Sequence, residues 1–170
     1  MEFKLKHTLL RPWKTEDAEA LAKHANNKNI ADNLRDGFPY PYTLHDARSW
    51  LEFAINNNNF LLAIDHEGEA IGGVGIIYKT DIYRKSAEVG YWLSQEFWGQ
   101  GIMTEAIITI VNHTFDNTDI VRIYAGIFEN NPASATVLKK VGFKLEAVHE
   151  QAIFKNGKFM NEMFYVKLKN

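Results

Sequence analysis

The stretch SAEVGYWLSQEFWGQGIMTEA, residues 86–106, joins a short apolar run, a turn with two glycines and the start of a helix. Residues 87–93 have the apolar and aromatic composition of a buried strand, and apolar side chains recur at helical spacing from Ile102 onward. The first N–H groups of a helix lack intrahelical partners, the helix dipole adds partial positive charge, and glycine lets an anion approach the backbone. This pattern predicts that residues 97–104 hold a ligand with a diphosphate group.

Two alternatives to this interpretation need to be weighed. A Gly-x-Gly turn also occurs in ordinary loops, so the turn alone does not establish a ligand site. The dinucleotide fingerprint fits poorly, because its third glycine falls at Thr104 and its acidic residue falls near Ile120, where the next predicted strand begins. A nicotinamide or flavin dinucleotide is therefore disfavoured as the ligand.

The composition narrows the classes of protein to which the chain can belong. Its length suits one domain, residues 1–170, and a net charge of −2 gives no support for nucleic-acid or membrane-surface binding. With no cysteine, disulfides, thiolate metal sites and a cysteine nucleophile are excluded, and the six histidines lack metal-ligand spacing, so no metal is expected. The N-terminal residues do not resemble a signal peptide and no run is long enough to span a bilayer, so we expect a cytoplasmic protein.

Periodicity, capping residues and turn residues predict the remaining elements. We expect strands over residues 3–10, 60–64, 70–78, 87–93, 120–128, 145–154 and 159–168. Helices are expected to begin near Thr15, near Thr43 or Asp46, near Gln100 and at Pro132. Asn156-Gly157 is a hairpin signal between the last two strands. This order indicates an α+β fold, with helices on both faces of a mixed sheet.

The segment Gly37-Phe38-Pro39-Tyr40-Pro41-Tyr42 is irregular and rich in aromatic residues. Phe38, Tyr40 and Tyr42 either lay their rings on the core, as in an ordinary loop, or form a wall of a substrate pocket. The second interpretation is reasonable because loops on a rigid scaffold often carry binding residues. Both interpretations stay open at this point.

Two stretches resemble the GNAT family of N-acetyltransferases: EFWGQGIMTEA at 96–106 and NPASATVLKKVGF at 131–143. LLRPWKTEDAEAL near the N-terminus and EVGYWL at 88–93 are similar to the RimJ/RimL branch, the ribosomal-protein N-terminal acetyltransferases. The resemblance covers residues 2–168. It implies a GNAT fold with a central, mixed, largely antiparallel sheet of about seven strands, splayed at the cofactor site. It also implies acetyl-CoA as co-substrate and an amine as acceptor.

The resemblance further implies which residues bind the cofactor. The strand would pair its backbone with the pantetheine arm, the glycine turn would hold the diphosphate through N–H groups, and the start of the last helix would border the CoA. The implied residues, in that order, are Val89, Tyr91 and Leu93; Gly99, Gln100, Gly101, Ile102, Met103 and Thr104; Asn131 and Ser134. Glu96 stands where the family motif has Gln or Arg, which weakens any side-chain contact there but leaves the backbone donors.

Glu88 is the candidate base for acetyl transfer to an amine. An amine that is protonated at neutral pH has no lone pair, so the reaction needs a base or a site that lowers the amine pKa. Strand alternation places Glu88 on one face with Gly90 and Trp92, and an acid inside an apolar strand needs a partner or a function. Glu88 either serves as this base, by resemblance through a water, or forms a structural ion pair with Arg84 or Arg122.

Many relatives have a tyrosine acid in the last helix, and Leu138 stands at the matching position. Ser134 is the candidate substitute. Because the chain has no cysteine, the simplest mechanism is direct transfer in a ternary complex. The acceptor is either a protein N-terminus, as the branch implies, or a small amine such as an amino acid, polyamine or aminoglycoside. The alternative from another class of protein is a sensor that binds CoA without catalysis. Relatives of this family are often homodimers.

Overall fold

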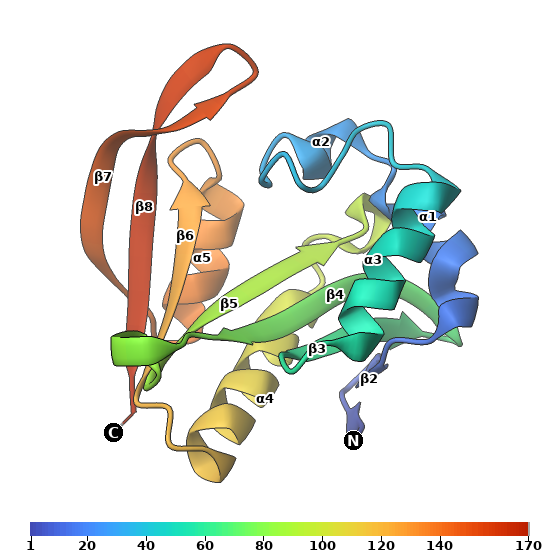
Figure 1. The fold of residues 1–170 in the computed structure, drawn as a ribbon, viewed down its shortest axis with the longest axis horizontal. Coiled ribbons are helices and arrows are strands. Elements are labelled where there is room, and N and C mark those ends of the chain that lie inside the picture. The colour runs from blue at the N-terminus through green and yellow to red at the C-terminus, as the bar shows by residue number, and fades with distance from the viewer. Residues whose placement is uncertain (170) are drawn as a thin grey trace.

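The computed structural model describes residues 1–169 and forms an open eight-stranded sheet with helices on both faces (Figure 1). The strands are β1 (Phe3–Lys4), β2 (Leu9–Pro12), β3 (Phe60–His66), β4 (Glu69–Tyr78), β5 (Ser86–Leu93), β6 (Arg122–Phe128), β7 (Lys144–Lys155) and β8 (Lys158–Leu168). The helices are α1 (Ala18–Ala25), α2 (Lys28–Ala31), α3 (Leu44–Asn56), α4 (Ile102–Asn117) and α5 (Pro132–Lys140). The strand order is β1-β2-β3-β4-β5-β6-β8-β7. The predicted α+β class is confirmed.

The sheet has one strand more than the seven expected, because the first predicted strand is a hairpin. β1 and β2 pair antiparallel, with Phe3 opposite Leu10, and the N–H of Leu5 donates to the carbonyl of Thr8 at 2.9 Å to close the turn. The sequence also gave no sign of α2, which occupies the polar segment after α1. Its N-cap is Asn27, whose side chain accepts a hydrogen bond from the N–H two residues later.

Among the described strands, only β5 and β6 pair in parallel, and they do so over three residue pairs: Ser86 with Arg122, Ala87 with Ile123, and Glu88 with Tyr124. β5 continues to Leu93 while paired with β4, and β6 continues to Phe128 while paired with β8. Both strands therefore extend past the end of their mutual pairing. Figure 1 shows them diverging from this point.

Two hydrophobic clusters hold the helices against opposite faces of the sheet. α4 and α5 contribute Ile107, Ile110 and Leu138 to one cluster, and all three side chains are fully buried. α1 and α3 contribute Leu21 and Leu51 to the other. Burying an aliphatic side chain of this size stabilises the fold by about 1.5–3 kcal/mol. Helices therefore cover both faces of the sheet, and α1 and α4 pack against the same strand, β4.

Arg11 on β2 is a buried charge that joins the start of α1 to the sheet. Its guanidinium donates two hydrogen bonds of 2.8 Å to Asp17, which occupies the N-cap position of α1, and one of 2.7 Å to Asp65 on β3. All three side chains are buried. The hydrogen bonds to Asp17 contribute most to raising the pKa of Arg11, and they outweigh the lowering effect of burial. A buried ion pair of this kind is costly to break from one side, because the other charge is left without a partner.

We expect Arg11→Met to lower the free energy of unfolding by about 3–5 kcal/mol, because two buried carboxylates lose their partner. Urea unfolding followed by circular dichroism measures this loss. Lys85→Met is the matched control, since Lys85 pairs with Asp119 at the exposed surface, and its unfolding midpoint should equal that of the wild type. A loss below about 1 kcal/mol in Arg11→Met would contradict a structural role for the buried network.

Candidate active site

The candidate active site lies where β5 and β6 part. Glu88 is the last residue of β5 that pairs with β6, and its partner is Tyr124. Beyond this pair, within residues 1–169, the facing edges of the two strands make no ladder with each other. A strand edge with unused N–H and C=O groups is a ready place for an extended ligand to pair. Val89, Tyr91 and Leu93, the predicted pantetheine-binding residues, lie on this stretch of β5.

Glu88 makes two ion pairs, one through each carboxylate oxygen. Arg35, in the loop after α2, donates from Nη2 to Oε1 at 2.5 Å, and Lys79, at the end of β4, donates from Nζ to Oε2 at 2.7 Å. Lys79 also lies 5.4 Å from the ring centre of Tyr124. Burial acts to lower the pKa of Lys79, but its interactions with Glu88 and Tyr124 outweigh that effect and raise the pKa above the ordinary value.

The ion-pair partners predicted for Glu88 are wrong. Arg122 lies two pairs before Glu88 in the ladder and forms a bidentate pair with Glu146 on β7, at 2.8 and 2.5 Å. Arg84 donates to the carbonyl of Asp81 at 3.0 Å within its own turn. Each of these two arginines therefore binds an acceptor other than Glu88.

The aromatic segment after α2 divides between core and surface. Phe38 packs edge-on against Trp92 of β5 with ring centres 5.6 Å apart, and Tyr42 lies 5.0 Å from Phe38 in the cluster under α1 and α3. Burial raises the pKa of Tyr42 to about 12. Tyr40 is exposed. Of the three predicted substrate residues, Phe38 and Tyr40 line a cavity, while Tyr42 lies within the core.

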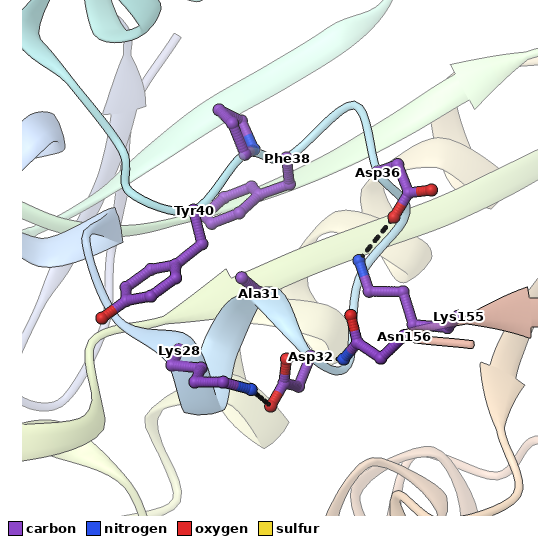
Figure 2. Close-up of a pocket in the computed structure, with 9 residues that line it drawn as sticks. Lys28, Ala31, Asp32, Asp36, Phe38, Tyr40, Lys155 and Asn156 are labelled. Atoms are coloured by element: carbon purple, nitrogen blue, oxygen red, sulfur yellow. Dashed lines mark hydrogen bonds and ion pairs between the residues drawn. The ribbon is translucent and has the colours of Figure 1, made fainter. Parts of the chain in front are cut away.

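This cavity of about 380 Å³ lies between the segment that follows α2 and the turn of the β7–β8 hairpin (Figure 2). Lys155 of the hairpin, only 9% exposed, donates to Asp36 at 2.8 Å, and Asn156 donates to Asp32 at 2.9 Å. Lys28 pairs with the second oxygen of Asp32 at 2.6 Å. The hairpin turn is thereby fastened to a segment more than a hundred residues away in the sequence.

Tyr91 and Ser134 meet across the opening between β5 and α5. Their hydroxyl groups share a hydrogen bond of 2.6 Å, and the N–H of Ser134 donates to Asn131, the N-cap of α5, at 3.2 Å. Burial raises the pKa of Tyr91 to about 12, although the hydrogen bond to Ser134 acts to lower it. Tyr91 is therefore a neutral phenol at neutral pH. Leu138, at the position of the absent tyrosine acid, is fully buried in the core.

The glycine turn before α4 has two residues with left-handed backbone conformation. Gly99 and Gly101 have φ angles of +76° and +80°, a region that favours glycine, and Gly101 is the N-cap of the helix. A Cβ added at either glycine would meet no atom within 4 Å, so the turn faces open space. Ile102 and Met103 bury their side chains in the core, which leaves their backbone N–H groups as the donors for a ligand.

Sequence reasoning missed three cations of the site: Arg35, Lys79 and Lys155. The antiparallel pairing of β4 with β5 was a usable signal for Lys79. It lies opposite Ser86, so its long side chain shares a face of the sheet with Glu88, two residues further along β5. Arg35 and Lys155 had no local signal, since their partners are 53 and 119 residues away.

Within residues 1–169, no three His, Asp or Glu side chains gather in the manner of metal ligands. Over the same range, no helix has the length and apolar character that crossing a membrane requires.

Comparison with known proteins agrees with this arrangement. The acetyltransferase (GNAT) domain model matches residues 7–144. The ribosomal-protein-serine acetyltransferase of Escherichia coli (strain K12) is 30% identical over 108 residues, which cover 64% of this chain and 60% of that protein. The spermidine N(1)-acetyltransferase of the same strain is 24% identical over 154 residues, covering 89% of this chain and 81% of that protein.

A solved structure has the same fold. RimL, a ribosomal L7/L12 alpha-N-protein acetyltransferase in complex with coenzyme A, superposes with a TM-score of 0.88 at 24% identity. The match covers 99% of this chain and 98% of that one. The predicted resemblance and the predicted fold are both confirmed.

The hydrogen bond between Tyr91 and Ser134 is testable by a double-mutant cycle. We expect Tyr91→Phe and Ser134→Ala each to lower the free energy of unfolding by about 0.5–1.5 kcal/mol, and the double variant to lose no more than either alone, because both remove the same bond. Urea unfolding measures all four proteins. Tyr83→Phe, which alters an exposed tyrosine, is the control and should match the wild type. Fully additive losses would show that the two hydroxyl groups are not coupled.

Proposed function

Because this chain belongs to the GNAT acetyltransferase family, we propose that it transfers the acetyl group of acetyl-CoA directly to a protein N-terminal amine. The observation that carries the proposal is the position of Glu88. It is a carboxylate at the point where two neighbouring strands stop pairing, which is where the bound cofactor and the incoming amine would meet. A carboxylate there has the right chemistry to take a proton from an amine.

We assign the cofactor to the opening between β5 and α5. The pantetheine arm would pair with the free edge of β5 over residues 89–93. The diphosphate would accept hydrogen bonds from the turn and first residues of α4, residues 99–104, and the CoA would run past Asn131 and Ser134. The positive φ angles of Gly99 and Gly101 and the open space beside them support this assignment. The RimL structure bound to coenzyme A supports the choice of cofactor.

The proposed reaction proceeds in a ternary complex. The ammonium first gives a proton to Glu88, directly or through a water, which frees the nitrogen lone pair. The amine nitrogen then attacks the thioester carbonyl carbon, the C–S bond breaks, and the CoA thiolate takes up the second proton that the nitrogen loses. Glu88 releases its proton to solvent. A phenol with a pKa of about 12 is a weaker acid than a thiol near 8.5, so the Tyr91–Ser134 pair would stabilise the thiolate by hydrogen bonding rather than by full proton transfer.

The charges around the site bear on the acceptor. Three carboxylates lie at Glu88 and the adjoining cavity, and four cations accompany them: Lys28, Arg35, Lys79 and Lys155. A polyamine carries several positive charges and would need an excess of carboxylates. A peptide N-terminus brings only one positive charge. The spermidine acetyltransferase among the relatives makes a small amine the second candidate.

The cofactor site is tested by thermal unfolding with acetyl-CoA. At a concentration of about 100 Kd, binding should stabilise the wild type by about 2.7 kcal/mol, which corresponds to a rise in Tm of roughly 5–10 °C at this chain length. Gly101→Trp should lose the shift, because the indole fills the open space at the turn. Gly157→Trp is the control, since this glycine also has a positive φ and open surroundings but lies in the distant hairpin.

NADH serves as the competing ligand in the same assay. The proposal expects no shift with NADH. It fails if acetyl-CoA gives no shift, or if NADH gives the larger one, because the glycine turn would then hold a different ligand or none.

The role of Glu88 is tested by Glu88→Gln. We expect kcat/KM to fall about 10²- to 10⁴-fold, because the amide cannot accept the proton, while the Kd for acetyl-CoA stays the same. A serine-initiated peptide serves as acceptor. Glu52→Gln, an exposed carboxylate on α3, is the control and should keep wild-type activity.

Two results would contradict the assignment in different ways. If Glu88→Gln kept wild-type activity, Glu88 would not be the base. A wild type that binds acetyl-CoA but acetylates neither peptides nor polyamines would instead be a CoA-binding sensor.

A further inference from the structure

We propose that Glu88 binds the ammonium group of the acceptor, and that the guanidinium of Arg35 occupies this binding position when no acceptor is present. Arg35 is then a specificity-determining residue, an internal competitor that only a positively charged acceptor displaces. The inference rests on the proposed function, because it concerns the acceptor of the same site.

The two cations on Glu88 differ in how firmly they are held. Lys79 is 29% exposed, stands at the end of β4 and lies against the ring of Tyr124. The side chain of Arg35 is 77% exposed, while the Glu88 side chain that it contacts is only 13% exposed. Oε2 is therefore held by a packed lysine, and Oε1 by a side chain that lies mostly in solvent. Water competes for a guanidinium that lies mostly in solvent, so the Arg35 contact exchanges more readily than the packed Lys79 contact.

When the ammonium group of the acceptor displaces the Arg35 guanidinium from Glu88, the total charge around Glu88 does not change. A guanidinium and an ammonium are both single positive charges that donate hydrogen bonds to a carboxylate. An α-amine with a pKa of about 7.7–8.0 is mostly protonated at neutral pH, so it arrives in the form that can compete. The acetylated product is a neutral amide and has no charge to hold the position. Arg35 then returns to Glu88, which favours release of the product.

The backbone on either side of Arg35 is held independently of this contact. Asp36 pairs with Lys155, which is only 9% exposed, and Asp32 accepts a hydrogen bond from Asn156, both at the hairpin turn (Figure 2). The Arg35 side chain can therefore swing away while the segment that carries it remains in place. The guanidinium can therefore leave Glu88 without any opening of the hairpin.

The test is calorimetric titration of the full chain, saturated with CoA, with a short serine-initiated peptide. We expect Arg35→Ala to bind the free-amine peptide roughly two- to fivefold more tightly than the wild type, the range expected when an exposed competing ion pair is removed. Arg35→Gln, which keeps hydrogen-bonding groups without the charge, should show the same gain. Arg48→Ala is the matched control, because Arg48 is exposed on α3 and forms no ion pair within residues 1–169.

The same peptide with an acetylated N-terminus isolates the role of charge. Its affinity should be equal in the wild type and in Arg35→Ala, because it has no ammonium group to compete. The inference is overturned if Arg35→Ala binds the free-amine peptide no more tightly than the wild type, or if it gains equally for both peptides. Acetyl transfer by the wild type, measured separately, decides the proposed function, so failure of the one is distinguishable from failure of the other.

Discussion

The site depends on the early end of the pairing between β5 and β6. Three residue pairs join the two strands, and each strand then continues for several residues with only its outer neighbour. The sheet tolerates this because β4 and β8 satisfy the outer edges and because helices pack on both of its faces. The inner edges keep N–H and C=O groups that the protein does not use for its own ladder, and buried backbone groups of this kind need a partner. The cofactor proposed for the opening would supply one.

Much of the fold was predictable because its signals are local. Thr43 with Asp46, Asn131 with Pro132, and Asn156-Gly157 each set a helix start or a turn within a few residues, and the structure agrees with all three. The hairpin of β1 and β2 and the short helix α2 were missed for the same reason: their few residues have too weak a pattern to separate them from a single strand or a polar loop.

The site was predictable only where strand alternation or helix capping determines which residues meet. Alternation placed Glu88 and Tyr91 on opposite faces of one strand, and the cap at Asn131 brought Ser134 to the start of α5. The partners of Glu88 were mispredicted because the choice among surface cations depends on tertiary packing. Arg35 reaches Glu88 only because the segment after α2 runs over the sheet, a placement fixed by its contacts with the hairpin and with Trp92.

Two arginine–carboxylate contacts in this chain show how burial changes the role of the same chemistry. Arg11 is enclosed with Asp17 and Asp65, each of its three guanidinium nitrogens has an acceptor, and nothing from solvent can replace it without exposing the network. Arg35 also contacts a largely buried carboxylate, but its own side chain stays in water, so a cation from solvent can take its place at little cost. The first contact fixes the fold, and the second leaves the carboxylate neutralised yet accessible. An acid within an apolar strand must be compensated in the free protein, and an exchangeable partner meets that need without closing the site.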